Sequence, residues 1–197
     1  IGYVMQSGGL LPHRTVVDNI ATVPLLSGAS RSAARSRAMD LLERVGLDSS
    51  LARRYPTQLS GGQRQRVGVA RALAANPDIL LMDEPFGAVD PVVRAELQQG
   101  LLRIQEDLAK TIVFVTHDVD EAFLLGDEVL VLRRGAQVAQ RGRPDEILLH
   151  PVDDFVSSFI GGDRRSLHVE RRDESATVVD AGGRLVGRLT GTPEENS

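Results

Sequence analysis

The sequence contains no cysteine among its 197 residues. Disulfide bonds and thiolate metal sites are therefore excluded, and the composition is compatible with a reducing compartment. No apolar run approaches the roughly 18 residues that a membrane-spanning helix needs, so any association with a membrane would go through a partner. The formal net charge of -4 gives no reason to expect nucleic acid as a partner, because nucleic acid favours a basic surface.

The chain starts at Ile1 rather than at a methionine. Residues Ile1 to Met5 are predicted to form a strand, and no signal peptide precedes it. We therefore expect the chain to be the remainder of a longer protein that has lost its N-terminal part. The length is sufficient for one sizeable core with a small appendage.

Two short stretches contain candidate functional residues: one could bind an anion, and the other ends in two carboxylates. Leu59–Gln63, with the sequence Leu-Ser-Gly-Gly-Gln, is predicted to open a helix, whose bare N–H groups and positive dipole end favour an anion such as phosphate. The apolar run Ile79–Met82 is too short for a helix and predicts a buried strand. Asp83 and Glu84 would then lie at the carboxyl edge of a sheet, where open α/β sheets place their chemistry. Taken alone, either stretch could equally be a loop or a solvated turn.

The pattern of apolar residues changes along the chain. Most of residues 18–75 is predicted to be helical, with a clear helix that begins at Ser30 and is followed by Gly46. Strands and helices alternate beyond this region, which predicts an α/β fold with a parallel sheet flanked by helices and an inserted helical subdomain. The predicted strands are Ile1–Met5, Ile79–Met82, Thr111–Thr116 and Glu128–Leu132.

The C-terminal tail, residues 163–197, has a different character. Its stretch from Ala176 to Gly187 predicts two strands around a tight turn, that is, a β hairpin. A hairpin of this size is not stable alone, so it packs on the main domain or belongs to something larger. Residues Thr192 to Ser197 are predicted to be disordered.

Five motifs resemble those of ABC-type ATPases, in the order and at the spacing that the family uses. They are the glutamine loop at Gln6, the signature motif at Leu59–Gln63, the Walker B strand at Ile79–Glu84, the D-loop at Gly87–Asp90 and the switch histidine at His117. The resemblance covers residues 1–162. It implies a partial ABC ATPase domain of P-loop NTPase-like fold, with ATP and Mg²⁺ as its cofactors.

The resemblance also implies roles for individual residues. Glu84 would be the general base that polarises the water attacking the γ-phosphate. Asp83 would hold Mg²⁺, through a water molecule, because magnesium keeps much of its hydration shell. His117 would donate a hydrogen bond to the γ-phosphate, and Gln6 would contact Mg²⁺ or the attacking water.

The signature motif implies a second subunit. In ABC ATPases the residues that correspond to Ser60, Gly61, Gly62 and Gln63 face the nucleotide held by the other subunit. Two ATPase subunits would therefore close head to tail around two ATP molecules, and Asp90 would cross their interface.

The sequence departs from the family at one important point. The phosphate-cradling pattern G-x-x-x-x-G-K-[S/T] is absent, and Lys110, the single lysine, has no glycine pattern before it. In the family this loop precedes the glutamine strand, so truncation before Ile1 is the simplest explanation. We expect the 197-residue chain to bind ATP poorly and not to hydrolyse it. Tight Mg²⁺-dependent ATP binding in calorimetry would contradict this expectation.

Other stretches resemble a particular class of importer. Residues Arg54–Gln58 before the signature motif look like those of importers, and Leu10-Leu11-Pro12 would line the groove that accepts the coupling helix of a transmembrane permease. Residues 2–6 with 12–16, and residues 155–164, resemble the ATPases that drive uptake of glycine betaine, choline, carnitine or proline. The hairpin at Val178–Val186 resembles a fragment of a CBS regulatory module.

This resemblance implies a peripheral protein on the cytoplasmic face of the inner membrane, with permease subunits as direct partners. An extracytoplasmic substrate-binding protein would act indirectly. Two alternatives stay open: the ATPase of another importer, for amino acids, polyamines or other small solutes, and a non-transport ABC-type regulatory ATPase with soluble partners.

Overall fold

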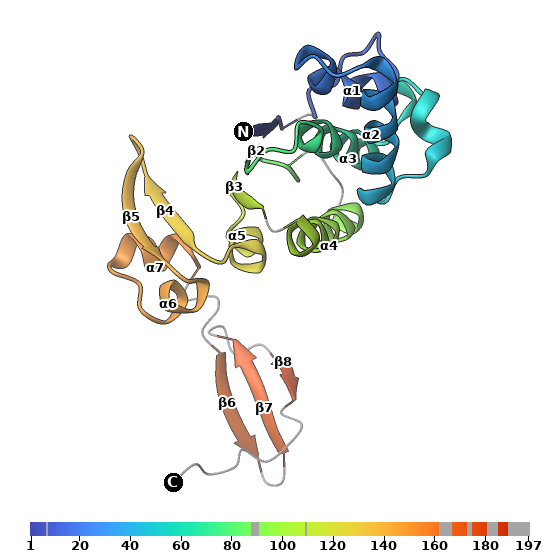
Figure 1. Ribbon diagram of the computed structural model, residues 1–197. Helices are drawn as coiled ribbons and strands as arrows, with labels where there is room; N and C mark the ends of the chain where they lie inside the picture. Colours follow the sequence, from blue (N-terminus) through green and yellow to red (C-terminus); the bar gives the residue numbers. More distant parts are fainter. Residues whose placement is uncertain are drawn as a thin grey trace. The chain divides into compact units, whose positions relative to one another are not determined.

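Three strands from distant parts of the chain form a parallel sheet in the computed structural model (Figure 1). The strands are β1 (Gly2–Val4), β2 (Ile79–Asp83) and β3 (Thr111–Val115), in the order β1-β2-β3. Leu81 of β2 lies opposite Tyr3 on one side and Val113 on the other. The predicted parallel sheet is therefore confirmed for these three strands.

The structure describes residues 1–6, 8–87, 91–108, 110–161, 167–172, 175–180 and 185–188. The chain divides into two compact units, Ile1–Asp118 and Val119–Ser197, and each is described by itself below. None of the helices in the described ranges is long and apolar enough to cross a lipid bilayer.

The two faces of the parallel sheet differ in exposure. Val4, Leu80 and Met82 are buried on one face, whereas Tyr3 and Val115 on the other are more than half exposed. This alternation follows from the two-residue period of a strand. The buried face supplies part of the core of the first unit.

Helices α1 (Val16–Leu26), α2 (Arg31–Arg44) and α3 (Gly61–Leu73) make up the predicted helical region, with the 3-10 turns η1 (Ser49–Arg53) and η2 (Pro56–Gln58) before α3. Each helix begins at a side-chain cap, since the hydroxyls of Thr15, Ser30 and Ser60 accept hydrogen bonds from backbone N–H groups in the first turn. The apolar sides of these helices bury Ile20, Leu42 and Val67, and the helices pack on one another. The helix predicted from Ser30 is confirmed.

Helix α4 (Pro91–Leu108) follows β2 and begins at a proline, a residue that suits the first position of a helix. Asp90, predicted as an interface residue, lies outside the described residues. Leu97 and Leu101 of α4 are both buried, and their four-residue spacing places them on one side of the helix.

The second unit begins with α5 (Val119–Leu125), followed by β4 (Val129–Arg133) and β5 (Gln137–Gly142). We expected β4 to continue the parallel sheet, but it pairs with β5 in an antiparallel two-stranded sheet. The reason is the tight turn between them, where Gly135 and Ala136 both have positive φ and reverse the chain.

A small apolar cluster supports this hairpin. Helices α6 (Pro144–Leu149) and α7 (Asp154–Phe159) contribute Ile147 and Val156, both fully buried, beside Val129 and Val131 of β4. Phe123 of α5 packs against the same cluster. The second unit therefore has a core of its own.

The tail contains β6 (Leu167–Arg172), β7 (Ser175–Asp180) and β8 (Leu185–Arg188), which form an antiparallel three-stranded sheet. The two predicted strands correspond to β7 and β8, whereas β6 was not predicted because its sequence is rich in charge. Residues 192–197, predicted to be disordered, are not among the described residues. The assignment of residues 163–197 to a CBS-like module stays a prediction.

Candidate functional site

Glu84 directly follows β2 and adopts an unusual backbone conformation. Its φ of 42° is left-handed, which is uncommon for a residue with a side chain. The Glu84 N–H donates to the carbonyl oxygen of Val115 at 2.9 Å, so the neighbouring strand β3 holds this conformation in place. Strain of this kind is concentrated at functional sites.

The carboxylate of Glu84 joins two residues from distant parts of the chain. Gln6 Nε2 donates to Glu84 Oε2 at 2.9 Å, and His117 Nδ1 lies 3.1 Å from Glu84 Oε1. The imidazole of His117 is 75% exposed, while the Glu84 side chain is 29% exposed. Both carboxylate oxygens are thus engaged, and the imidazole is open to solvent.

The topology explains why these three residues meet. Gln6 lies just after β1, Glu84 just after β2 and His117 just after β3. Because the strands are parallel and adjacent, their carboxyl ends lie at one edge of the sheet. The sequence prediction placed Glu84 and Asp83 at such an edge, and the structure brings Gln6 and His117 to the same place.

Asp83 is the last residue of β2 and is exposed. In the described part of the chain, no three carboxylate, imidazole or thiol groups gather as they would in a protein-made metal cage. Mg²⁺ rarely uses such a cage; it is bound through one or two carboxylates together with water and substrate phosphates. Asp83 therefore fits a magnesium ligand of this sparse kind.

The signature residues form the N-terminus of α3. Ser60 Oγ accepts from the Gln63 N–H at 3.2 Å, and Gln63 Oε1 accepts from the Ser60 N–H at 2.9 Å, which is a capping box. The amide oxygen of Gln63 is therefore occupied within its own helix turn. The N–H groups of Gly61 and Gly62 have no acceptor within the helix and are suited to an anion.

No hydrogen bond or ion pair joins this capped turn to Gln6, Glu84 or His117 within the described ranges. The predicted site residues thus form two groups, a carboxylate cluster at the sheet edge and a glycine turn on α3.

Gly87 limits the space around the Glu84 carboxylate. A Cβ added at Gly87 would lie 3.2 Å from Glu84 Oε2, so a side chain there would press on the carboxylate. The Gly87 N–H also donates to the Glu84 carbonyl oxygen at 3.2 Å. This glycine belongs to the predicted D-loop, of which residues 88–90 lie outside the described residues.

Arg71 of α3 holds the loop behind Gln6, a role that sequence reasoning missed. Its guanidinium donates to the carbonyl oxygens of Gly9 at 2.7 Å and Gly8 at 2.9 Å. Burial lowers the pKa of Arg71 from its ordinary value. Gly68, one turn earlier, lets α3 approach closely, because a Cβ there would lie 3.1 Å from the Gly8 backbone. Residues three apart lie on the same side of a helix, so the spacing of Gly68 and Arg71 was the sequence signal that both contact the same segment.

Asn19 shapes the loop at Leu10-Leu11-Pro12 and was also missed. Asn19 is fully buried, and its Oδ1 accepts from the Leu11 N–H at 2.8 Å. Its Nδ2 donates to the carbonyl oxygens of Leu11, Arg14 and Thr15 at 3.0 to 3.1 Å. An asparagine within an apolar stretch is the signal that could have identified it.

Comparison with known proteins identifies relatives of the chain. Residues 1–87 match the family described as ABC transporter. The choline transport ATP-binding protein of Bacillus subtilis is 49% identical over 178 residues, which are 88% of this chain and 46% of that protein. The glycine betaine uptake system ATP-binding protein of Escherichia coli is 54% identical over 161 residues, which are 82% of this chain and 52% of that protein. The chain spans about half the length of these curated relatives.

The solved structures that resemble the chain are also ABC proteins. A dimeric ATP-binding cassette in a post-hydrolysis state with ADP and Pi bound matches with a TM-score of 0.62 and 37% identity, over 73% of this chain and 62% of that one. CbiO1 of Clostridium perfringens, part of an ABC transporter complex, matches with a TM-score of 0.68 and 30% identity, over 76% and 59%.

Proposed function

Because the chain belongs to the ABC transporter ATP-binding family, we propose that it is part of an ATPase that powers the import of quaternary ammonium osmoprotectants. The observation that carries the proposal is the Glu84 carboxylate, held between Gln6 and His117 beside Asp83 at the sheet edge. The substrate class is supported by relatives named for the transport of choline and of glycine betaine.

The geometry supports a proposed task for each side chain. Glu84 accepts a proton from an attacking water, and its two hydrogen-bonding partners fix the direction of its oxygens. His117, exposed at the same edge, would turn the N–H that faces Glu84 toward a phosphate oxygen when nucleotide is bound. Asp83 would hold Mg²⁺, which would supply positive charge to the phosphates as their charge develops. Gln6 links the carboxylate to the loop that Arg71 secures on α3.

The proposed active unit is a pair of subunits. The N–H groups of Gly61 and Gly62 have no acceptor within the helix and are suited to an anion. In the part of the chain that the structure describes, no hydrogen bond or ion pair joins their turn to the Glu84 cluster of the same chain. The turn of one subunit would therefore complete the phosphate site of the other, in a head-to-tail dimer that Asp90 crosses. The likeness to a dimeric cassette supports this arrangement.

The remaining partners lie at the membrane. The loop at Leu10-Leu11-Pro12, which Asn19 holds by two hydrogen bonds to the Leu11 backbone, would receive the coupling helix of a permease. The ATPase would then sit at the cytoplasmic face of the inner membrane, and an extracytoplasmic binding protein would deliver the solute to the permease.

The experiment uses a polypeptide that joins this chain to an upstream phosphate-binding loop from one of its relatives. Glu84→Gln is expected to lower ATP turnover by about 100-fold or more, the usual worth of a general base. Glu96→Gln is the matched control, because Glu96 is 65% exposed on α4 and pairs weakly with Arg66 at 3.5 Å. Turnover within about twofold of the wild type in Glu84→Gln would remove Glu84 from the proposed role.

The solute is tested by transport. Vesicles containing the ATPase and its permease should accumulate labelled glycine betaine or choline, and this uptake should be lost in Glu84→Gln. Uptake of amino acids or polyamines alone would indicate a different importer. Failure to recover any permease with the protein from membranes would instead favour a regulatory ATPase.

A further inference from the structure

A groove lies between the start of α1, the start of α2 and Tyr55, which precedes η2. Its volume is about 620 Å³, which is within the range of sites that take a ligand or several side chains of a partner. The groove is lined from His13 onward, directly after the loop at Leu10-Leu11-Pro12, and all of its lining belongs to the first unit.

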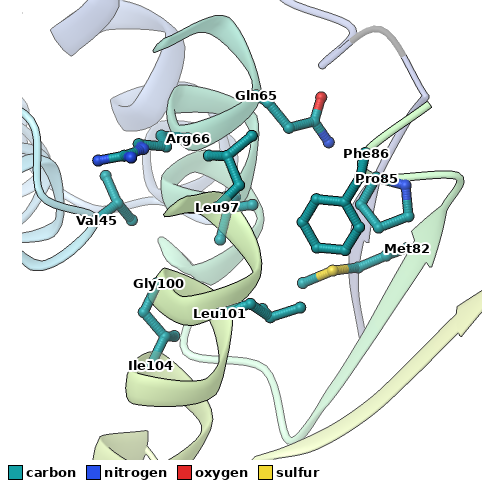
Figure 2. Close-up of a pocket in the computed structure, with 11 residues that line it drawn as sticks. Val45, Gln65, Arg66, Met82, Pro85, Phe86, Leu97, Gly100, Leu101 and Ile104 are labelled. Carbon is teal, nitrogen blue, oxygen red and sulfur yellow. The ribbon is translucent and has the colours of Figure 1, made fainter. Parts of the chain in front are cut away.

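Another hollow of the first unit is much smaller. Figure 2 shows Met82, Phe86 and Leu101 around it, and its volume is about 30 Å³. That space holds about one or two water molecules, and a segment of a partner cannot enter it. The groove at the start of α1 and α2 is therefore the hollow that suits a larger occupant.

The groove has more positive than negative charge. Three arginines and one aspartate line it, and Arg35 pairs with that aspartate, Asp18, at 2.7 Å. Arg14 donates to the Thr22 hydroxyl, which carries no charge, at 3.1 Å. Arg31 is exposed and has neither an ion pair nor a hydrogen bond among the residues that the structure describes. Two positive charges, those of Arg14 and Arg31, thus have no counter-charge in the groove.

This positive charge is a property of one part of the chain. Residues 1–75 contain ten arginines and four acidic residues, a net charge of +6, whereas the whole chain has a net charge of -4. The remaining residues therefore carry a net charge of -10. An acidic partner is attracted to residues 1–75 and repelled by the rest, so the charge distribution selects this side for it.

The walls of the groove define the chemistry of the occupant. A guanidinium binds a carboxylate through two parallel hydrogen bonds, and Arg31 is available for such a pair. Leu25 and Tyr55 add apolar surface beside the arginines, and Tyr55 is 45% exposed. A lipid bilayer presents a broad, flat surface, whereas a protein segment projects both carboxylates and apolar side chains into a hollow. An acidic protein segment therefore fits the groove better than a lipid surface.

We propose that the groove docks an acidic cytoplasmic segment of the permease, with a carboxylate that pairs with Arg31 and an apolar side chain that lies against Leu25 and Tyr55. Because the groove adjoins the loop at Leu10-Leu11-Pro12, one partner covers both. The inference rests on the proposed function, through which alone the permease is a partner.

The test uses the joined polypeptide of the ATPase experiment, recovered from detergent-solubilised membranes with the permease that mass spectrometry identifies. Arg31→Glu reverses the unpaired charge and should weaken binding to that permease about tenfold or more. Glutamate suits the first turn of a helix, so α2 should stay folded in this variant. Urea unfolding of the variant checks that it does.

Arg44→Glu is the matched control. Arg44 is exposed in the last turn of the same helix, about 20 Å from Arg31 along its axis, and it does not line the groove. The control makes the same change in net charge and should bind the permease within about twofold of the wild type. Binding that is equal in the wild type, Arg31→Glu and Arg44→Glu would overturn the proposal.

A reciprocal change tests the ion pair itself. Each acidic residue in the cytoplasmic segments of the recovered permease is changed to lysine in turn. One of these lysine variants should restore binding of Arg31→Glu to within about threefold of the wild-type pair, because residues in contact are coupled energetically. If no lysine variant restores binding, the proposed pair does not exist.

Two further outcomes identify what has failed. If the wild-type polypeptide binds vesicles of phosphatidylglycerol without permease, and Arg31→Glu abolishes that binding, the groove faces lipid and the proposal is wrong. If the wild-type polypeptide recovers no permease at all, the proposed function and this inference fail together. Recovery of the permease without any dependence on Arg31 overturns this inference alone.

Discussion

The first unit joins segments that are far apart in the sequence, whereas the second pairs segments that are neighbours. The hydrogen bond between Gln6 and Glu84 spans 78 positions, while a three-residue turn connects β4 to β5. All described residues of the candidate site lie in the first unit. The site therefore depends on long-range packing, since its residues meet only when three strands and α3 have assembled.

The largest expected effect concerns the local core of the second unit. Ile147 is fully buried in the cluster of the β4–β5 hairpin, so Ile147→Ala should cost about 2–5 kcal/mol through lost burial and a cavity. Hydrogen exchange should speed up in residues 129–160 and stay unchanged in residues 79–83 and 111–115. Equal acceleration in the β2 and β3 amides would show that the two units unfold together, and would contradict a separate core in the second unit.

Arg71 tests the long-range packing of the first unit. Arg71→Ala removes two charge-assisted bonds to the Gly8 and Gly9 carbonyl oxygens and should cost about 2–3 kcal/mol. Amide hydrogen exchange should become faster at Gly8 and Gly9, in the loop that follows Gln6. Arg53→Ala, at an exposed position of η1, is the control and should stay within about 0.5 kcal/mol. An equal cost in the two variants would mean that Arg71 does not secure the loop.

Gly68 and Gly100 test the packing of α3 on the Gly8 loop. Gly68→Ala pushes a methyl group against the Gly8 backbone at 3.1 Å and should destabilise the chain by about 1–3 kcal/mol. Gly100→Ala meets no atom within 4 Å and should instead stabilise helix α4 by about 0.5–1 kcal/mol. Urea midpoints that move in the same direction for both would contradict the close approach of α3 to the Gly8 loop.

The smallest expected effect is a surface ion pair at α1. Hydrogen bonding to Arg35 lowers the pKa of Asp18, assisted by the Thr15 hydroxyl, against some desolvation. A lowered native pKa stabilises the fold above the ordinary aspartate value of 3.8, and this contribution is lost as the pH falls through the native value. Asp18→Asn should cost about 0.5–1 kcal/mol at neutral pH after allowance for solvent screening.

The pH dependence provides the check on this pair. The difference in urea midpoint between wild type and Asp18→Asn should shrink as the pH falls below about 4, and it should be constant from pH 5 to 8. A difference that grows in acid would contradict the assigned direction of the pKa shift.

Local signals in the sequence predicted much of the fold and the position of Glu84. Caps at Ser30 and Ser60, and the apolar run of β2, depend on residues close together in the chain, so they could be identified without the structure. The parallel direction of β1, β2 and β3, though not their order in the sheet, followed from the alternation of strands and helices. The resemblance to ABC-type ATPases, inferred from the motifs, is confirmed by the family match over residues 1–87 and by the similarity to ATP-binding proteins of transporters.

The features that were missed depend on packing between distant segments. The pairing of β4 with β5 was decided by a turn with two positive φ values, and β6 is a charged strand without an apolar pattern. The guanidinium of Arg71 and the buried amide of Asn19 satisfy backbone groups of other segments. Contacts between distant segments produce no local pattern in the sequence, so they could not be predicted from it.

Strands β1, β2 and β3 bring Gln6, Glu84 and His117 together. Nuclear magnetic resonance of the His117 ring nitrogens in the 197-residue chain tests this arrangement. An ionised Glu84 carboxylate accepts hydrogen bonds, so the neutral imidazole should carry its hydrogen on Nδ1 and donate it to Glu84 Oε1. In Glu84→Ala the hydrogen should move to Nε2. The same tautomer in both proteins would contradict the cluster and the catalytic role proposed for it.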